Sequence, residues 1–294
     1  MYTSLLNKYN FKLSKLIGGS NPSTDPNLIL SSWEKLEKNG SIDGSNYTFT
    51  IYHKSFNSDE KPVLFAMAGF STKSCAQSSQ VILDKIDMLE TKYKSVYIIN
   101  LDTIKKLQNV RFDQQEKGAK ELKKIKDLNK RTPEYQEVKN KPELDLTRSL
   151  ANAINNIIGE LGLSNVHLLG KSSGGGVVIN LVNLNVRYTG LFVSVPMWPY
   201  NITQLSQDTL NRVKFRFAWN INDEYVNFDW RDDEIIKFSY HEKAVYDQNM
   251  ANFIKENKDI DYMSIMFHPD LLITRTDYPG HEIHHKLIDF FTLM

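Results

Sequence analysis

Two kinds of apolar pattern run along this chain and predict most of its strands. Residues 46–54, NYTFTIYHK, alternate apolar and polar side chains, which is typical of a strand with one buried face. Other apolar runs are short and continuous, as in strands that are buried on both faces. These runs are KPVLFAMAGF (61–70), KSVYIINLD (94–102), NVHLLG (165–170), YTGLFVSVP (188–196) and VKFRFAWNI (213–221).

Segments with helical spacing separate these runs. Helices are expected at 28–38, 146–163, 174–185 and 238–257, and a last strand at 270–276 with 261–267 as its alternative. Buried strands separated by helices predict an α/β fold, an open and mostly parallel sheet with helices on both faces. Ligands bind such sheets beyond the carboxyl ends of the strands, so the residues just after each strand are the candidates for function.

Two segments do not follow this alternation of strands and helices. Residues 1–45 are polar and read as an N-terminal extension, with a loop at 18–27, ahead of one α/β domain at 46–294. Within that domain, a charged insertion at 105–145 carries many lysines, arginines and carboxylates and predicts one or two exposed helices. The insertion is either a solvated surface feature or a lid over the active site.

Composition and charge narrow the class of protein. The chain has 294 residues, of which 41% are hydrophobic, enough for a full core. Lys and Arg number 36 against 35 Asp and Glu, a balance that gives no reason to expect nucleic-acid binding. The single cysteine, Cys75, excludes an internal disulfide framework and is expected to be a buried residue. We see neither a signal peptide nor an apolar run of about 20 residues, and therefore expect a soluble cytoplasmic protein without a membrane span.

A candidate nucleophile follows the expected strand at 165–170. Residues 170–174, GKSSG, match the pattern G-x-S-x-G. When Ser172 occupies a very tight strand-to-helix turn, Gly170 and Gly174 are pressed together and a side chain at either would clash. A phosphate-binding loop also contains Gly-Lys-Ser, but it needs a glycine where this chain has Asn165.

A second motif lies near the end of the sequence. Residues 281–285, HEIHH, contain H-E-x-x-H, which on a helix places two histidines, here His281 and His285, on one face to hold zinc. Such a site needs a third protein ligand, and only Asp289 is available locally.

Residues 146–176, LTRSLANAINNIIGELGLSNVHLLGKSSGGG, resemble the helix, strand and nucleophile elbow of the α/β-hydrolase superfamily of serine hydrolases. The resemblance covers roughly residues 47–294, apart from the charged insertion. It implies a nucleophile, an acid and a histidine in that chain order, and it assigns the nucleophile to Ser172.

The same resemblance implies the other two members of a catalytic triad. The acid should follow a later strand, where Asp223 matches best and Glu224 is the alternative. The histidine should follow the last strand, where His281 stands after a Pro-Gly turn, and His268 replaces it if the last strand is 261–267. His281 therefore reads better as a general base than as a zinc ligand, and His167 reads as a hydrogen-bonded interior residue.

The oxyanion hole of such an enzyme uses backbone amides. The residue after the nucleophile, Ser173, gives one donor, and the turn after 61–70 gives the other, with Phe70 as candidate and Ser71 next. Many relatives carry His-Gly at this turn, whereas this chain has Ala68-Gly69.

The expected function is cleavage of carboxylic esters of small or medium acyl groups through an acyl-enzyme, with no cofactor and no metal. Too few residues lie between the strands at 188–196 and 213–221 for a conventional cap domain. Lipase, thioesterase and peptidase activities are the alternatives on the same fold. A non-catalytic binding protein of the same fold and a zinc hydrolase are the alternatives from other classes.

Overall fold

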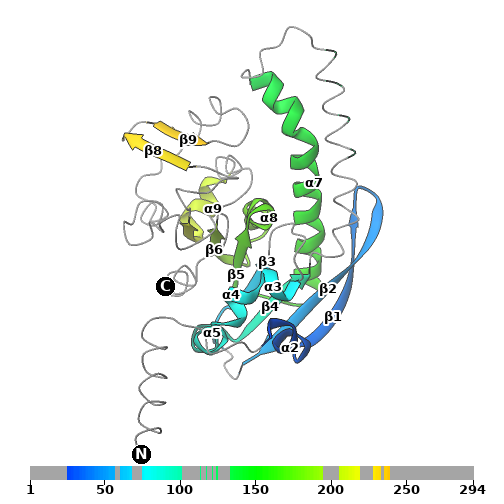
Figure 1. Cartoon of the computed structure of the whole chain (residues 1–294), viewed down its shortest axis with the longest axis vertical. Helices are drawn as coiled ribbons and strands as arrows, with labels where there is room; N and C mark the ends of the chain where they lie inside the picture. Colours follow the sequence, from blue (N-terminus) through cyan, green and yellow to red (C-terminus); the bar gives the residue numbers. More distant parts are fainter. Residues whose placement is uncertain are drawn as a thin grey trace, which may run out of the picture.

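A mixed sheet of seven strands forms the middle layer of the protein, in the spatial order β1-β2-β4-β3-β5-β6-β7 (Figure 1). The computed structural model describes residues 25–56, 60–67, 75–100, 113, 117, 121, 124, 133–194, 205–218, 228–232 and 235–238. The strands of this sheet are β1 (Glu34–Ile42), β2 (Ser45–Ser55), β3 (Val63–Met67), β4 (Ser95–Asn100), β5 (Val166–Lys171), β6 (Tyr188–Ser194) and β7 (Lys214–Ala218).

The direction of pairing changes once across this sheet. β1, β2 and β4 pair antiparallel, whereas β4, β3, β5, β6 and β7 pair parallel. The expected mostly parallel sheet is therefore confirmed. A separate hairpin of β8 (Phe228–Asp232) and β9 (Ile235–Phe238) was not predicted from the sequence.

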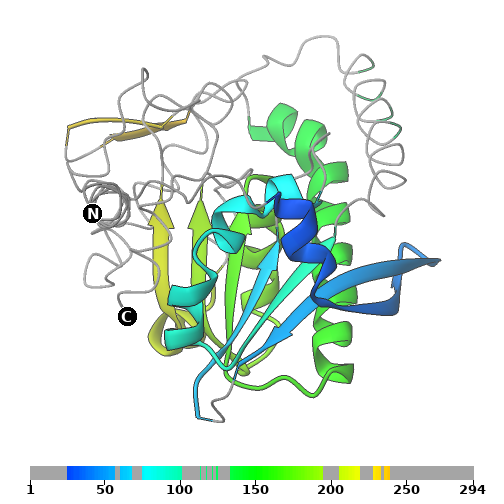
Figure 2. The same cartoon turned by 60° about the horizontal axis from the view of Figure 1, so that its bottom comes forward.

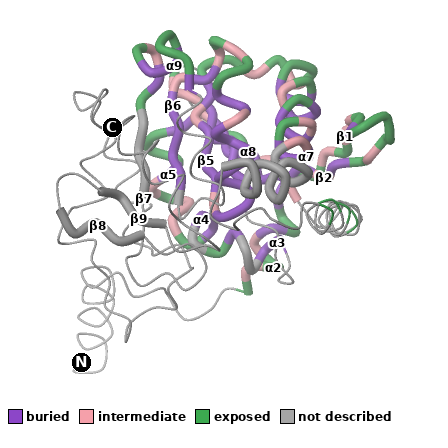
Figure 3. Tube along the Cα trace, turned by 90° about the horizontal axis from the view of Figure 1, so that it is seen from above, coloured by how far each residue is buried: buried purple, intermediate pink, exposed green. Residues whose placement is uncertain are grey.

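Helices cover both faces of the sheet (Figures 1 and 3). One face packs on α7 (Pro133–Glu160) and α8 (Ser173–Val182), and its buried side chains also contact residues of α9 (Gln207–Arg212). The other face packs on four short helices: α2 (Pro26–Ser31), α3 (Cys75–Ser78), α4 (Gln80–Leu83) and α5 (Ile86–Lys92). The buried Cys75 begins α3, as its lack of any motif suggested.

The two-sided burial explains why the central strands read as continuous apolar runs. Successive side chains of a strand point to opposite faces. Accordingly, Val63, Phe65 and Met67 of β3 belong to the core with α7 and α8. Leu64 and Ala66 of the same strand belong to the core with α2 to α5.

The first strand is the main difference from the sequence prediction. The helix expected at 28–38 ends at Ser31 as α2, and residues 34–42 form β1 instead. Asp43 and Gly44, with φ of 50° and 79°, make the two-residue turn that joins β1 to β2. Such Asp-Gly turns favour a hairpin, and pairing with β2 outweighs the weak helical spacing of this polar segment. β1 belongs to the sheet although it falls within residues 1–45, of which residues 1–24 lie outside the described chain.

The charged insertion contains helical residues. Asp113, Lys117, Glu121 and Lys124 are helical and exposed, and α7 begins at Pro133 within the insertion. Among the described residues, no helix is long and apolar enough to cross a membrane. Residue 238, where a helix is expected to begin, is the end of the strand Ile235–Phe238; the rest of the element expected at 238–257 and the elements expected at 261–267 and 270–276 lie outside the described chain.

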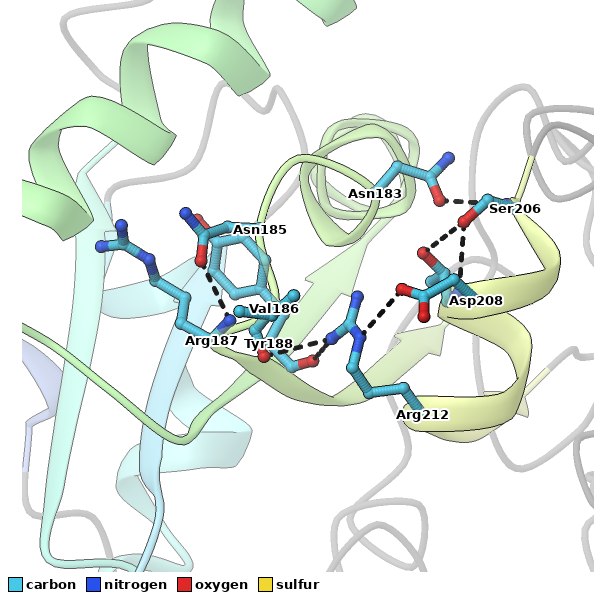
Figure 4. A network of polar contacts seen from close by, with 9 residues as sticks. Asn183, Asn185, Val186, Arg187, Tyr188, Ser206, Asp208 and Arg212 are labelled. Atoms are coloured by element: carbon cyan, nitrogen blue, oxygen red, sulfur yellow. Dashed lines mark hydrogen bonds and ion pairs between the residues drawn. The ribbon is translucent and has the colours of Figure 1, made fainter.

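A polar network stabilises the end of the sheet at which β6 and β7 begin (Figure 4). Arg212 of α9 donates to the carbonyl oxygens of Val186, at 3.3 Å, and Tyr188, and its Nε lies 3.5 Å from Asp208. The Ser206 amide donates to Asn183 Oδ1 at 3.2 Å, which links α9 to the end of α8. These contacts fix the starts of β6 and β7. Ser172 lies toward the opposite end of the parallel strands, after β5.

Candidate active site

Ser172 occupies the turn between β5 and α8, where the sequence pattern placed it. Its backbone has φ of 52° and ψ of −123°, in a region that side-chain-bearing residues rarely adopt. β5 ends at Lys171 and α8 begins at Ser173, so a single residue reverses the chain from strand to helix. The expected tight strand-to-helix turn is therefore present at Ser172.

Close packing around Gly170 makes this turn possible. A Cβ atom on Gly170 would lie 2.7 Å from the Gly174 carbonyl oxygen and 2.8 Å from the Gly175 Cα, and would also overlap the Val178 side chain. Real Cβ atoms essentially never come within 3.0 Å of backbone atoms. The glycine at position 170 is thus required by the approach of α8 to the end of β5.

Ser172 stands at the N-terminus of α8, a helix of ten residues. The Gly176 amide donates to the Ser172 carbonyl oxygen at 3.2 Å, the first hydrogen bond of the helix. Ser173 is the first residue of α8, and amides of a first helical turn are directed out of the helix toward its N-terminal end. The partial positive charge there favours an oxyanion next to Ser172.

β3, the neighbour of β5 in the sheet, ends beside the turn at Ser172. Met67 at the end of β3 lies opposite Gly170 in the sheet register. The connection after β3 enters the helices on one face, whereas the connection after β5 enters α8 on the other face. Adjacent parallel strands whose connections diverge in this way form the position at which open α/β sheets bind ligands.

Three residues are expected to act with Ser172. Phe70 and Asp223 follow the ends of described strands, and His281 lies further along the chain. Phe70 comes three residues after Met67, at the start of the connection that leaves β3. Asp223 comes five residues after Ala218, the end of β7. Phe70, Asp223 and His281 themselves lie outside the described residues, as do the alternatives Ser71, Glu224 and His268. Their roles remain predictions.

The metal alternative falls on the same undescribed part of the chain. Within the described residues, no group of three or more His, Cys, Asp or Glu side chains is placed to hold a metal ion. His281, His285 and Asp289, which a zinc site would use, lie outside those residues.

His167 on β5 is an interior residue, as expected from the sequence. Its Nδ1 lies 3.2 Å from the Tyr93 hydroxyl, and its ring makes edge contacts with Tyr93 and Phe192. Burial of the ring, with a smaller effect from the charge of Lys214, lowers the pKa of His167 to about 4. His167 is therefore a neutral, half-buried side chain at ordinary pH.

Helix α7 extends past the carboxyl ends of the parallel strands (Figure 2). With 28 residues it is about 42 Å long, whereas the six residues of β5 span about 20 Å. The helix leads directly into the start of β5, so its excess length projects past the carboxyl ends of the strands. The end of the charged insertion at 133–145 is thus on the same side of the sheet as the nucleophile turn.

The connection between β6 and β7 is short. It comprises residues 195–213, of which the structure describes 205–213 with the one-and-a-half-turn helix α9. A separate domain needs about 50 residues or more. A connection of this length is too short for a conventional cap domain, as the sequence predicts.

No family model matches this sequence, and no curated protein matches it. Among solved structures, the chain is similar to a predicted CIB-like hydrolase from Thermoplasma acidophilum, with 12% identity and a TM-score of 0.36 over 66% of this chain and 77% of that one. It is similar to the N-acyl homoserine lactonase AidH, with 13% identity and a TM-score of 0.32 over 55% and 45% of the two chains. A thermophilic esterase from Thermogutta terrifontis gives 11% identity and a TM-score of 0.32 over 56% and 46%. The chain spans less than half the length of the last two.

The architecture itself is more informative than these low similarities. The strand order β1-β2-β4-β3-β5-β6-β7 is antiparallel at its first three strands and parallel from β4 onward. The strained serine lies between the fifth strand and the helix that follows it. With this strand order and this turn, the chain has the α/β-hydrolase fold.

Proposed function

We propose that this protein is a serine hydrolase that cleaves carboxylic esters through an acyl-enzyme, with Ser172 as nucleophile. The observation that carries the proposal is the backbone of Ser172, with φ of 52° and ψ of −123°. His281 acts as general base and Asp223 orients it.

The strained backbone supports a chemical role for Ser172 because glycine would be the less costly residue at this position. Glycine adopts such a backbone at less cost, and a side chain there costs of order 1–3 kcal/mol. Serine is also a favoured helix N-cap, but within α8 the Ser172 side chain makes no capping hydrogen bond. Strain of this kind is typical of residues held in position for function.

In the first step, Ser172 Oγ attacks the ester carbonyl carbon while its proton passes to His281. Asp223 holds the imidazole in the tautomer that accepts this proton. The amides of Ser173 and Phe70 stabilise the oxyanion of the tetrahedral intermediate. His281 then protonates the leaving alkoxide, and water activated by the same histidine hydrolyses the acyl-enzyme.

The substrate class follows from the surroundings of Ser172. The connection between β6 and β7 is too short for a cap domain, which favours esters of small or medium acyl chains. The side chain of Ser172 is nevertheless covered, since the residue is only 8% exposed. We therefore expect compact, monomeric esters to react faster than aggregated lipids.

The first experiment is covalent labelling of the purified protein with a fluorophosphonate probe. The labelled residue is identified by tandem mass spectrometry of the peptide that contains Ser172. We expect label on Ser172, its complete loss from that position in Ser172→Ala, and no effect of a zinc chelator. Absence of label on Ser172 in folded protein would contradict the proposal and favour a binding protein, and chelator-sensitive ester hydrolysis would favour the zinc enzyme.

A second experiment assigns the other two residues. Hydrolysis of p-nitrophenyl acetate and p-nitrophenyl octanoate is measured for Asp223→Asn and His281→Gln. By analogy with other triads, each change should lower kcat by about 10⁴-fold or more. Glu224→Gln and His284→Gln are the matched controls and should retain nearly full activity. Loss of activity in Glu224→Gln instead of Asp223→Asn would move the acid to the neighbouring residue.

A further inference from the structure

A second serine with a histidine and a carboxylate lies on the outer strands of the sheet. Ser55 and His53 are two residues apart on β2, so their side chains lie on the same face. Glu34 on β1 is directly opposite His53 in the antiparallel register. The hairpin thus brings three side chains of the kind used in nucleophilic catalysis to one place.

The contacts between them have the order of a catalytic triad. Glu34 Oε2 lies 2.9 Å from His53 Nδ1, and Ser55 Oγ lies 3.1 Å from His53 Nε2. A carboxylate only accepts hydrogen bonds, so in the neutral imidazole Nδ1 of His53 is the donor and Nε2 is the acceptor. Ser55 therefore donates its hydroxyl proton to the nitrogen that can act as its base.

Packing holds the histidine ring in this orientation. Tyr97 of β4 lies opposite His53 in the register, and the two rings stack with centroids 4.2 Å apart and an interplanar angle of 15°. The His53 side chain is 13% exposed, whereas Ser55 is exposed. The base is thus fixed and largely covered, and the hydroxyl remains accessible to a reagent.

The cluster is distant from Ser172. Ser55 ends β2 opposite Ser95, which begins β4. The carboxyl ends of the parallel strands lie at the other end of the sheet, measured along the strands. Ser172 follows β5 at that end. Any reaction at Ser55 is therefore separate from the proposed ester hydrolysis.

From this geometry we propose that Ser55 is a second nucleophilic site, which is covalently modified by activated acyl and phosphonyl groups. His53 Nε2 takes the proton from Ser55 as Oγ bonds to the carbonyl carbon or the phosphorus. The bond to the leaving group breaks, and a phenolate or fluoride departs with the electron pair. Glu34 balances the positive charge that forms on His53.

The modification is expected to be stoichiometric, without rapid turnover. An efficient acyl-transfer site uses the amide after the nucleophile to bind the oxyanion. At Ser55 that amide belongs to Phe56, which donates instead to the Lys94 carbonyl oxygen at 2.7 Å. Only electrophiles with good leaving groups should therefore react, and the ester formed on Ser55 should persist.

The test uses the Ser172→Ala variant, so that no label comes from that residue. This variant is incubated with a fluorophosphonate, and the rate of labelling at Ser55 is compared with that at Ser45. Ser45 is exposed on the same face of β2, where its register partner on β1 is Ile42. Trypsin cleavage after Lys54 places the two serines in different peptides, and fragment ions distinguish Ser55 from Ser58.

We expect Ser55 to be labelled about 100-fold faster than Ser45, the lower end of the usual effect of a positioned base. His53→Gln should reduce this rate to that of Ser45, and Glu34→Gln should lower it by about 10-fold, with circular dichroism confirming that both variants are folded. Ser55→Ala in the otherwise unchanged protein should leave ester hydrolysis intact. Labelling of Ser55 at the rate of Ser45, or a rate unaffected by His53→Gln, overturns the proposal, whatever the result at Ser172.

Discussion

Gly170 and Gly174 are in such close contact that a methyl group on Gly170 would lie 2.7 Å from the Gly174 carbonyl oxygen. The atoms that would be displaced belong mainly to the backbone of α8, which cannot move without opening the turn at Ser172. Stability and the backbone geometry of Ser172 therefore depend on the same contact.

Gly170→Ala should lower the free energy of unfolding by about 1–3 kcal/mol or more, the usual cost of overpacking a buried site. It should also remove most ester hydrolysis, because relief of the clash shifts Ser172. Urea unfolding and p-nitrophenyl ester assays measure the two effects. Gly159→Ala is the control, since its new methyl group would meet only the flexible end of Arg187, at 3.3 Å. That variant should keep its stability or gain up to about 1 kcal/mol from better helix propensity.

Two substitutions of Ser172 separate strain from chemistry. Ser172→Ala and Ser172→Gly both remove the hydroxyl group and should be equally inactive. Only glycine also relieves the cost of a side chain at φ of 52°. We expect Ser172→Gly to be more stable than Ser172→Ala by about 1 kcal/mol or more, measured by urea unfolding. Equal stability of the two variants would argue that the turn carries no strain.

Most of the sheet could be predicted from the sequence because burial on both faces leaves a continuous apolar run. β3 shows this clearly, with all five residues buried. The sequence predicts a helix over part of β1 because the polar residues of this strand face solvent. Its place in the sheet depends on pairing with β2. The local signal that could have identified it is Asp43-Gly44, a strong hairpin turn.

Some functional candidates can be predicted from the sequence and others cannot, depending on whether their neighbours in space are also neighbours in the chain. Ser172 and Gly170 carry a local motif, since the strand, the turn and the helix are contiguous in sequence. His53 and Glu34 lie far apart along the chain and meet only through the register of β1 with β2. A slip of one residue would place Glu34 on the other face, so composition and spacing could not reveal that cluster.

His167 should make stability depend on pH in mildly acid solution. Its pKa is lowered to about 4 in the folded protein, mainly by burial, from the ordinary value of 6.5. Between these values the unfolded chain binds a proton that the folded protein does not, so stability falls as pH decreases from 6.5 to 4. The full loss corresponds to about 3 kcal/mol at 1.36 kcal/mol for each pKa unit.

The measurement is urea unfolding at several pH values for the wild type and for His167→Phe. Phenylalanine keeps an aromatic ring beside Tyr93 and Phe192 but cannot be protonated. The variant should have a constant offset in stability, because the Tyr93 hydroxyl loses its partner, and a shallower decline below pH 6.5. Identical slopes for the two proteins would mean that His167 does not titrate as described.

Gly190 on β6 makes room for the same histidine. The register of β5 with β6 shifts between Val166 and His167, which brings Gly190 opposite the ring. A Cβ atom on Gly190 would lie 2.7 Å from His167 Cδ2. Because His167 is packed between Tyr93 and Phe192, its ring cannot easily turn away.

Gly190→Ala should therefore destabilise the protein by about 1–3 kcal/mol through overpacking. In a His167→Ser background the ring is absent, and the added methyl group should cost little or fill part of the space left behind. A double-mutant cycle from urea unfolding should give a coupling of about 1 kcal/mol or more between the two positions. Additive effects would instead locate the cost of Gly190→Ala in the β6 backbone, independently of His167.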